Sequence, residues 1–396
     1  MSMEAKKVMV IGGGIAGLIA ARELSRNGIQ VELVEKADFL GGHAIQYACK
    51  ATDTCQQCGA CTVESVLKEV VREPNIRVHL ASRVEQISGS PHFEVKLERV
   101  AITDMHDTFK DCLKGYDKNP VQCAAVKGYS RHNAIYRTAD GRLNPDICQT
   151  ADKLEVDAIV WATGFVPFDP NQKPTYRYGE LPNVVSGMDL ERSKRASGSF
   201  LRPSDGKPPQ EIAFIQCVGS RDERLGHLWC SKVCGPYALR LALGMKHQNP
   251  DAKITIFYMD IQNTDHCFPA FYRQCLNDLT FVRTVPVDMF QTDEDRIRTR
   301  YMSENDSGPV EAEFDLVVLS VGIMPGADND ALADLLHARL TPDGFAASTD
   351  KLNVTKTHQK GIFLAGTVQG PKDIADSIAH AGNAAGEVIK YLRRAS

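Results

Sequence analysis

The sequence predicts an α/β protein made of two doubly wound domains of the dinucleotide-binding type. The first observation is a glycine-rich turn placed between a short apolar strand and a helix near the N-terminus. The second is a pair of similar segments, beginning at Asp157 and Asp315, that suggests two related domains. The third is the length of 396 residues, because chains longer than about 250–300 residues usually divide into several cores.

The N-terminal segment has the pattern of a βαβ unit. Lys7–Ile11 is apolar and short enough for a buried strand, and 15–27 shows helical periodicity. Gly28 ends the predicted helix, and the second strand covers 30–35. A glycine turn between strand and helix is typical of nucleotide-binding domains.

The repeat places a second domain in the middle of the chain. Residues 157–168 read DAIVWATGFVPF and residues 315–326 read DLVVLSVGIMPG, each with an acidic residue, a buried strand, a glycine and a proline. Further strand, helix and strand patterns cover 211–216, 236–246 and 253–259. We therefore predict a first domain from 1–166 and 315–396, with an insertion at 98–153, and a second domain at 167–314.

Composition excludes several functional classes. A hydrophobic fraction of 43% and a charged fraction of 24% are those of an ordinary globular protein. The net charge of -4 gives no reason to expect nucleic acid as a partner. Since no apolar run reaches the length of a membrane span and no signal core precedes the first strand, we expect a cytoplasmic protein.

The glycine turn has the spacing of a pyrophosphate-binding loop. Gly12 permits the tight turn, Gly14 lets the backbone approach a phosphate, and Gly17 lets the helix pack on the strand. The backbone around Ile15 and Ala16 would then supply free N–H groups at a helix N-terminus. Glu35, which ends the second strand 18 residues after Gly17, is placed to bind ribose hydroxyls.

Two further features favour FAD over NAD at this turn. The pair Gly41-Gly42 follows Glu35 closely, and the tripeptide Ala162-Thr163-Gly164 ends a buried strand, as in two-domain FAD oxidoreductases. A glycine loop that serves only as a turn is the structural alternative. Near the C-terminus, a strand ending in Ala-Gly is expected to direct a helix toward the isoalloxazine ring. The remaining predicted FAD contacts are Lys36, His43, Val84, Gly366, Lys372, Asp373 and Ile374. The sequence marks no general acid or base.

The second domain lacks an intact nucleotide loop. Its first strand continues into Cys217-Val218-Gly219-Ser220-Arg221, which has one glycine where three are needed. Cys217, Cys230 and Cys234 are instead expected to converge where a dinucleotide would bind. The pattern suggests an iron–sulfur cluster, although a cubane usually takes four thiolates and only three are found. The alternative is that these cysteines are small apolar core residues.

A second group of cysteines follows Gly42. The chain has 12 cysteines, and Cys55, Cys58 and Cys61 have the spacing of cluster ligands. Three interpretations remain open: iron–sulfur ligands, a redox-active Cys55/Cys58 pair, and a structural loop.

Several segments resemble the A subunits of heterodisulfide reductases. They are FIQCVGSRDE (214–223), FYMDI (257–261), EFDLVVLSVG (313–322) and AGTVQGPKD (365–373). The resemblance extends over nearly the whole chain and implies a thioredoxin-reductase-like core whose FAD exchanges electrons with [4Fe–4S] clusters. The sequence departs from the family at Gly235, where the family has a second cysteine. It also has no recognisable ferredoxin motif, in the insertion or elsewhere, and we expect it to be a short version without the family's extra N-terminal domain.

A version without ferredoxin motifs is similar to the A subunits of the quinone-interacting membrane-bound oxidoreductases of sulfate-reducing microbes. This resemblance implies an FAD-containing electron-transfer subunit between the quinone pool and a soluble reductase such as adenylylsulfate reductase. It also implies two partner subunits, one a homologous ferredoxin-bearing flavoprotein and the other a haem-containing membrane subunit that reacts with quinone. The protein would then lie at the inner membrane through these partners, and relatives pair as homodimers. The alternative is a stand-alone flavin-dependent disulfide or pyridine-nucleotide oxidoreductase, which would need an intact second glycine turn.

Overall fold

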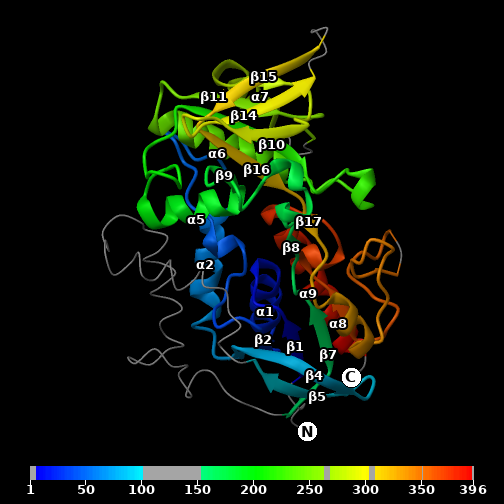
Figure 1. The fold of residues 1–396 in the computed structure, drawn as a ribbon. Coiled ribbons are helices and arrows are strands. Elements are labelled where there is room, and N and C mark those ends of the chain that lie inside the picture. The colour runs from blue at the N-terminus through cyan, green and yellow to red at the C-terminus, as the bar shows by residue number, and fades with distance from the viewer. Residues whose placement is uncertain (1–5, 101–152, 263–267, 303–307, 350, 395–396) are drawn as a thin grey trace. The chain divides into compact units, whose positions relative to one another are not determined.

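A computed structural model describes residues 6–100, 153–262, 268–302, 308–349 and 351–394 (Figure 1). The chain divides into two compact units. Unit 1 comprises Met1–Gln46, Gly59–Val166 and Pro325–Ser396, and unit 2 comprises Tyr47–Cys58 and Pro167–Met324. Most of the predicted insertion at 98–153 lies outside the described residues.

Unit 1 is built on a five-stranded parallel sheet in the order β18-β7-β1-β2-β3. These strands are β1 (Lys7–Ile11), β2 (Gln30–Val34), β3 (Ile76–His79), β7 (Ala158–Trp161) and β18 (Ile362–Leu364). The predicted βαβ unit is therefore present, with α1 (Ile15–Arg26) connecting β1 to β2. Short apolar runs form these strands because a parallel sheet is buried on both faces.

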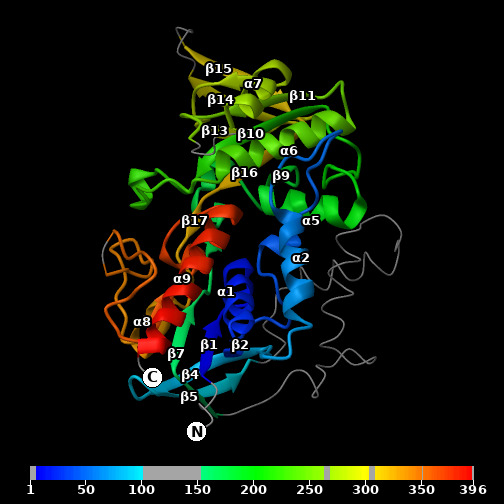
Figure 2. The same ribbon diagram turned by 180° about the vertical axis from the view of Figure 1, so that it is seen from behind.

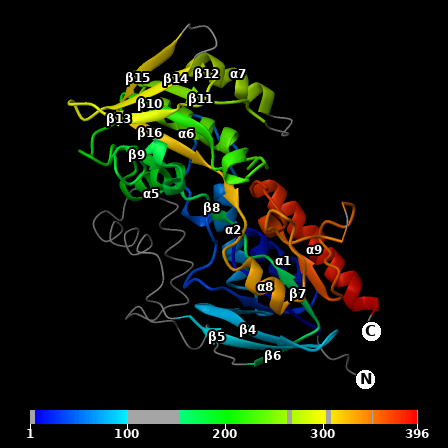
Figure 3. The same ribbon diagram turned by 45° about the vertical axis from the view of Figure 1, so that its right-hand side comes forward.

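Two layers cover this sheet. On one face α1 contacts both α2 (Ala60–Val70) and α9 (Ile374–Arg394), and Figure 2 shows α1 between these two helices. The other face carries α8 (Asn329–Leu335) and an antiparallel sheet of β4 (Ser82–Ser88), β5 (Phe93–Arg99) and β6 (Lys153–Val156), seen in Figure 3. Met9, Ile11 and Trp161 point into this second layer and form its buried core with Val95 and Leu336.

Unit 2 repeats the arrangement with a parallel sheet in the order β12-β11-β10-β16-β9. Its strands are β9 (Val184–Ser186), β10 (Glu211–Val218), β11 (Lys253–Phe257), β12 (Thr280–Val282) and β16 (Leu316–Val321). The helices are α5 (Gly187–Ser197), α6 (Cys234–Gln248) and α7 (Phe268–Asp278). The antiparallel layer consists of β13 (Asp288–Gln291), β14 (Ile297–Met302) and β15 (Pro309–Phe314).

Short elements complete the two units. The 3-10 helices are η1 (Ala44–Gln46), η4 (Pro170–Gln172), η5 (Pro174–Tyr176), η6 (Glu223–Leu225) and η7 (Gly366–Gln369). A two-stranded sheet is formed by β8 (Val166–Pro167) and β17 (Ile323–Met324). None of the helices in the described part of the chain is long and apolar enough to cross a bilayer.

The sequence repeat corresponds to equivalent strands of the two units. Asp157 directly precedes β7, and its carboxylate accepts a hydrogen bond from the backbone N–H of Lys7 at 2.9 Å. Asp315 directly precedes β16, and its carboxylate accepts one from the N–H of Glu211 at 3.1 Å. The two aspartates therefore tie β1 to β7 in unit 1 and β10 to β16 in unit 2, which explains why an acidic residue begins both segments.

One segment belongs to a different unit from the residues on either side of it. Residues 47–58, which we predicted within the first domain, form part of unit 2, as do 315–324. The buried Lys50 ammonium is paired with the carboxylate of Glu191 in α5, and the Glu191 side chain is completely buried. The same carboxylate accepts a hydrogen bond from the N–H of Ala48 at 2.7 Å. A buried ion pair with long sequence separation thus fixes this segment, and hydrophobic periodicity gives no sign of such a pair.

Candidate functional site

The glycine turn of unit 1 has the shape that its spacing predicts. Gly12 has a φ of +107°, and a methyl group there would lie 2.4 Å from the carbonyl oxygen of Ala162. A methyl group on Gly17 would lie 1.8 Å from the carbonyl oxygen of Gly12. A methyl group on Gly14 would meet no atom within 4 Å. The turn is therefore tight at both ends and open at Gly14, the position that has to admit a phosphate.

The helix behind the turn leaves donors for an anion. Helix α1 begins at Ile15, and no side chain caps its N-terminus at Gly14. The first backbone hydrogen bond of the helix runs from the N–H of Leu18 to the carbonyl of Gly14 at 2.9 Å. The N–H groups of Ile15 and Ala16 precede this bond and point along the helix axis, as in an anion-binding helix terminus.

A second glycine pair closes against this turn. The N–H of Gly41 donates to the carbonyl of Gly13 at 2.8 Å, and Gly14 and Gly41 form an isolated parallel bridge. A methyl group on Gly42 would lie 3.1 Å from the Cα of Gly14, so larger residues would crowd the turn. Ala162 contacts Gly12, and Gly164 has a φ of +81° at the end of β7. The structure thus brings together three of the predicted segments, including Ala162-Thr163-Gly164.

Glu35 directly follows β2, which ends at Val34, one residue earlier than predicted. Its carboxylate accepts hydrogen bonds from the N–H of Gly13 at 2.6 Å and from the N–H of Ala37 at 2.7 Å. Burial raises the pKa of Glu35, while these backbone donors act in the opposite direction. The acid is therefore held against the glycine turn, where a bound adenosine would place its ribose.

The C-terminal segment also contributes to this site. Gly366 has a φ of +74°, and a methyl group there would lie 2.4 Å from the Cβ of Ala16. The N–H of Gly366 donates to Nδ1 of His380 in α9 at 2.9 Å, and Nε2 of His380 lies 3.1 Å from the carbonyl oxygen of Val354. Burial lowers the pKa of His380 to about 4, which keeps the imidazole neutral and able to accept. Sequence reasoning missed His380, whose only signal is its place in a helix with small residues on one side.

The N-terminus of α9 lies beside the start of α2. A methyl group on Gly59 would lie 3.0 Å from the side chain of Ile374, and the carboxylate of Asp373 accepts from the N–H of Asp376 at 2.7 Å. Lys372 is held by its own loop, since its ammonium donates to the side chain of Gln369 at 2.6 Å. That α9 begins at the flavin, with Lys372, Asp373 and Ile374 in contact with it, stays a prediction.

The three other predicted contacts have different surroundings. His43 lies beside Gly42 and its Nε2 is 3.0 Å from the carbonyl oxygen of Phe165. Lys36 is exposed and pairs with Asp328 at 2.6 Å. Val84 is buried in the core of unit 1 with Ile11 and Val34, so only its backbone is available to a ligand. Taken together, the glycine segments, Glu35 and the two helix termini fit a dinucleotide such as FAD.

The corresponding position in unit 2 is filled by aromatic side chains. A methyl group on Gly219, where φ is +80°, would lie 2.0 Å from the ring of Phe168. The ring of His227 packs edge-on against Phe168 at 5.9 Å and tilted against Trp229 at 4.9 Å. Nδ1 of His227 lies 2.9 Å from the carbonyl oxygen of Gly219, and the indole N–H of Trp229 donates to the carbonyl of Ile323 at 2.9 Å. These rings occupy the approach to the strand end that a pyrophosphate would need.

Two of the three unit 2 cysteines are in contact. Cys217 is the second-last residue of β10 and Cys234 is the first residue of α6, and their sulfurs are 3.8 Å apart. The hydrogen bond from Cys217 and the nearby Ser231 hydroxyl lower the pKa of Cys234 to about 6. The same interaction raises the pKa of Cys217 above its ordinary value. Cys230 is half-buried, burial raises its pKa, and its sulfur accepts from the N–H of Lys232 at 3.2 Å.

These thiols do not fit a cubane cluster. Ligand sulfurs of a cubane bind separate irons and stand well apart, whereas those of Cys217 and Cys234 are in contact. Gly235 follows Cys234, so no fourth thiol is present there. In the part of the chain that the structure describes, no three His, Cys, Asp or Glu side chains are arranged to hold a metal ion.

The first cysteine group is divided between the two units. Cys55 and Cys61 are exposed and Cys58 is half-buried. Cys55 and Cys58 belong to unit 2, whereas Cys61 belongs to α2 of unit 1. The three interpretations of this group therefore stay predictions.

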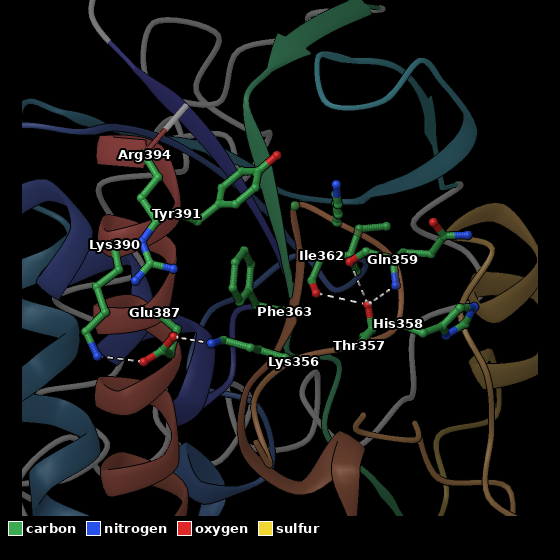
Figure 4. Close-up of a pocket in the computed structure, with 12 residues that line it drawn as sticks. Lys356, Thr357, His358, Gln359, Ile362, Phe363, Glu387, Lys390, Tyr391 and Arg394 are labelled. Atoms are coloured by element: carbon green, nitrogen blue, oxygen red, sulfur yellow. Dashed lines mark hydrogen bonds and ion pairs between the residues drawn. The ribbon is translucent and has the colours of Figure 1, made fainter. Parts of the chain in front are cut away.

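Unit 1 has a further pocket at the amino end of β18, away from the carboxyl ends of the strands where the glycine segments meet. Figure 4 shows Glu387 between Lys356 and Lys390, with which it pairs at 2.6 and 2.7 Å. The Thr357 hydroxyl donates to the carbonyl oxygens of Gln359 and Ile362 at 3.1 and 3.0 Å. The walls also include His358, Lys360, Phe363, Tyr391 and Arg394. Its charged groups are mostly paired with each other, and sequence reasoning did not select it.

Comparisons with known proteins agree with this description. A family model described as an NAD(P)-binding Rossmann-like domain matches residues 10–64. One of the iron-sulfur A subunits of CoB–CoM heterodisulfide reductase from Methanopyrus kandleri is 33% identical over 98% of this chain and 64% of its own length. The corresponding iron-sulfur A subunit of Methanocaldococcus jannaschii is 32% identical, over 97% of the chain and 64% of its own length. The chain therefore spans less than two thirds of these relatives.

Solved structures confirm the predicted fold class. The alignment with thioredoxin reductase from Lactococcus lactis covers 98% of this chain and 99% of that reductase, with a TM-score of 0.59 and 16% identity. Thioredoxin reductase from T. acidophilum covers 99% of this chain and 100% of its own, with a TM-score of 0.57 and 13% identity. At these identities the likeness concerns the fold alone: two doubly wound units of the thioredoxin-reductase type.

Proposed function

Because the chain is a homologue of the heterodisulfide reductase A subunits over nearly its whole length, we propose that it is an FAD-dependent oxidoreductase subunit that transfers electrons. The observation that carries the proposal is the convergence in unit 1 of Gly12–Gly17, Gly41-Gly42 and Gly366 around an open position at Gly14. When bound, FAD supplies the chemistry of accepting an electron pair and releasing the electrons singly.

The residues of unit 1 have separate tasks in this proposal. The N-terminus of α1 and the open face of Gly14 hold the pyrophosphate, and Glu35 holds the ribose. His380 fixes the position of Gly366 through the acceptor atom Nδ1. The N-terminus of α9, beginning at Ile374, directs its positive end toward the negative charge that a reduced ring carries.

The source of electrons follows from unit 2. Phe168, His227 and Trp229 fill the approach that a nicotinamide dinucleotide needs, so hydride delivery from that domain is disfavoured. This observation argues against the stand-alone pyridine-nucleotide oxidoreductase. Electrons then have to arrive from, and leave to, protein partners, as expected of a subunit in a larger complex.

The end points of the transfer rest on sequence resemblance. We propose a membrane-associated complex that passes electrons between the quinone pool and a soluble reductase such as adenylylsulfate reductase. Its other members are a homologous ferredoxin-bearing flavoprotein and a haem-containing, quinone-reactive membrane subunit. We assign the iron–sulfur clusters to the ferredoxin-bearing partner, because Cys217, Cys230 and Cys234 do not fit a cubane.

The first experiment tests the flavin site. Gly14→Ala adds a methyl group where the structure leaves space and where φ is -71°, so the fold should tolerate it while phosphate approach is blocked. Gly382→Ala in α9 is the matched control, since its methyl group also meets no atom within 4 Å. We expect the dissociation constant for FAD, measured by titration of the refolded apoprotein, to rise at least tenfold only in Gly14→Ala, which is a loss of at least about 1.4 kcal/mol of binding free energy. Equal dissociation constants in both variants would refute the site.

The second experiment tests the electron route. The purified FAD-loaded chain is mixed anaerobically with NADH, and separately with a menaquinol analogue plus the two partner subunits. We expect flavin bleaching only with the partners, followed by reoxidation when adenylylsulfate and its reductase are added. Rapid bleaching by NADH alone would favour the stand-alone oxidoreductase instead.

A further inference from the structure

The strand end that has lost its nucleotide loop in unit 2 carries two opposed sulfurs. Sγ of Cys217 and Sγ of Cys234 are 3.8 Å apart, which is a contact distance, and a disulfide needs about 2.05 Å. The two cysteines come from different elements, the end of β10 and the first turn of α6.

The surroundings of this pair differ from those of a structural core cysteine. Cys234 is the first residue of α6, where the positive end of the helix favours negative charge on the sulfur. Cys217 has a φ of +58°, a backbone conformation that residues other than glycine rarely adopt. By contrast Cys275, another buried thiol of unit 2, lies inside the regular helix α7.

The strand end also has unused hydrogen-bonding groups. The side chains of Gln216, Ser220 and Ser320 are each at least 97% buried and have no hydrogen-bond partner among the described residues. The pairing of β10 with β16 shifts between Ile215 and Val218, which places Ser320 opposite the irregular residues Gln216 and Cys217. The donors and acceptors of these three side chains are therefore available to a polar molecule at this strand end.

We propose that Cys217 and Cys234 are a redox-active dithiol/disulfide couple that exchanges with small organic disulfides. The thiolate of Cys234 attacks one sulfur of a disulfide RSSR, which forms a mixed disulfide and releases RS⁻, protonated to RSH. The sulfur of Cys217 then attacks Cys234, which forms the Cys217–Cys234 bond and releases the second RSH. In total two protein thiols lose two electrons and two protons, and one RSSR becomes two RSH.

This couple goes beyond the flavin function and does not depend on it. A cluster at this place would need a fourth thiolate, and Gly235 provides none. A thiol pair needs only the two sulfurs that are already in contact. At the position where related domains bind a hydride donor, this chain then carries a thiol pair. Hydride transfer and thiol–disulfide exchange both move electrons in pairs.

The test is made on the unmodified full-length chain, purified without oxygen, with iron, zinc and FAD measured per chain. The protein is equilibrated with buffers of oxidised and reduced dithiothreitol in varied ratios, quenched with an alkylating reagent, digested, and analysed by mass spectrometry. We expect Cys217 and Cys234 to lose alkylation together and to appear as one linked peptide two hydrogens lighter. Cys275 should stay alkylated after unfolding at every ratio. Return to reduced buffer should restore both thiols.

Variants separate the couple from other outcomes. In Cys234→Ser, Cys217 should remain reduced throughout the titration, whereas Cys275→Ser should leave the linked peptide unchanged. Two results would overturn the proposal: both thiols staying alkylatable at all ratios, or one iron or zinc site per chain that is lost in Cys217→Ser. The FAD measurement is separate, because a chain with the linked peptide and no FAD would refute the flavin function and leave the couple standing.

Discussion

Replacement of Lys50 by methionine should destabilise unit 2 more than any surface change. The Lys50 and Glu191 side chains are 2% and 0% exposed, and their pair is supported by the N–H of Ala48. The ammonium also lies 5.0 Å from the ring centre of Tyr47 and 5.4 Å from that of Tyr237. Lys50→Met keeps the volume and removes the charge, so the Glu191 carboxylate stays buried without its partner.

The magnitude follows from this burial. Breaking one side of a buried ion pair costs about 3–5 kcal/mol, whereas an exposed pair contributes at most about 1 kcal/mol. For a unit of 150–250 residues, each kcal/mol moves the melting temperature by roughly 2–4 °C, which gives a decrease of about 6–20 °C. The matched control is Lys253→Met, which breaks a Lys–Glu pair with Glu211 at 3.1 Å in the same unit, with side chains that are 80% and 34% exposed. Its melting temperature should fall by no more than about 4 °C.

The assay needs a signal from unit 2 alone. The chain has 2 tryptophans, Trp161 in unit 1 and Trp229 in unit 2. In a Trp161→Phe background, thermal unfolding followed by Trp229 fluorescence reports unit 2 for each variant. Adding Glu191→Leu to Lys50→Met removes the unpaired charge and should recover most of the loss. Equal shifts for Lys50→Met and Lys253→Met, or no recovery in the double variant, would refute the reasoning.

Three more outcomes are expected. Gly17→Ala should prevent both folding of the turn and FAD binding, seen as insoluble or flavin-free protein, because its methyl group meets the Gly12 carbonyl at 1.8 Å. Gly219→Ala should lower the stability of unit 2 by about 1–3 kcal/mol in urea unfolding, since it collides with Phe168 at 2.0 Å. The pKa of His380 is lowered to about 4 by burial, so the unfolded chain takes up this proton first as pH falls. The contribution of neutral His380 to the free energy of unfolding should be fully present above pH 6.5 and should fall by at most about 3 kcal/mol between pH 6.5 and pH 4. His380→Gln should flatten this part of the plot of unfolding free energy against pH.

Local spacing was sufficient to predict the shape of the glycine turn in unit 1. The roles of Gly12, Gly14 and Gly17 follow from their order along a strand, a turn and a helix, and the distances around them agree with those roles. The repeated aspartates, Asp157 and Asp315, also have matching partners in the two units. Such features are predictable because the residues involved are close in sequence or repeat at equivalent positions.

Contacts between distant residues were not predictable. Nothing in the periodicity of 47–58 indicates that Lys50 pairs with a glutamate from a helix far along the chain. The missing glycines around Gly219 predicted the loss of a nucleotide loop, but not that Phe168 would fill the space. Cys217 and Cys234 were expected to converge, and only the structure gives a sulfur contact where a cluster was suggested.

The assignment of Tyr47–Cys58 to unit 2 has a consequence for how the chain folds on the ribosome. Lys50 leaves the exit tunnel long before Glu191 has been made. The segment 47–58 therefore has nothing to pack against until α5 and β10 have been synthesised. Likewise α1 is synthesised long before α9, the helix that it contacts. A fragment of residues 167–324 would lack Lys50, so the carboxylate of Glu191 would be buried without its ion-pair partner. Neither half of the protein can therefore be moved to another context as one continuous stretch of sequence.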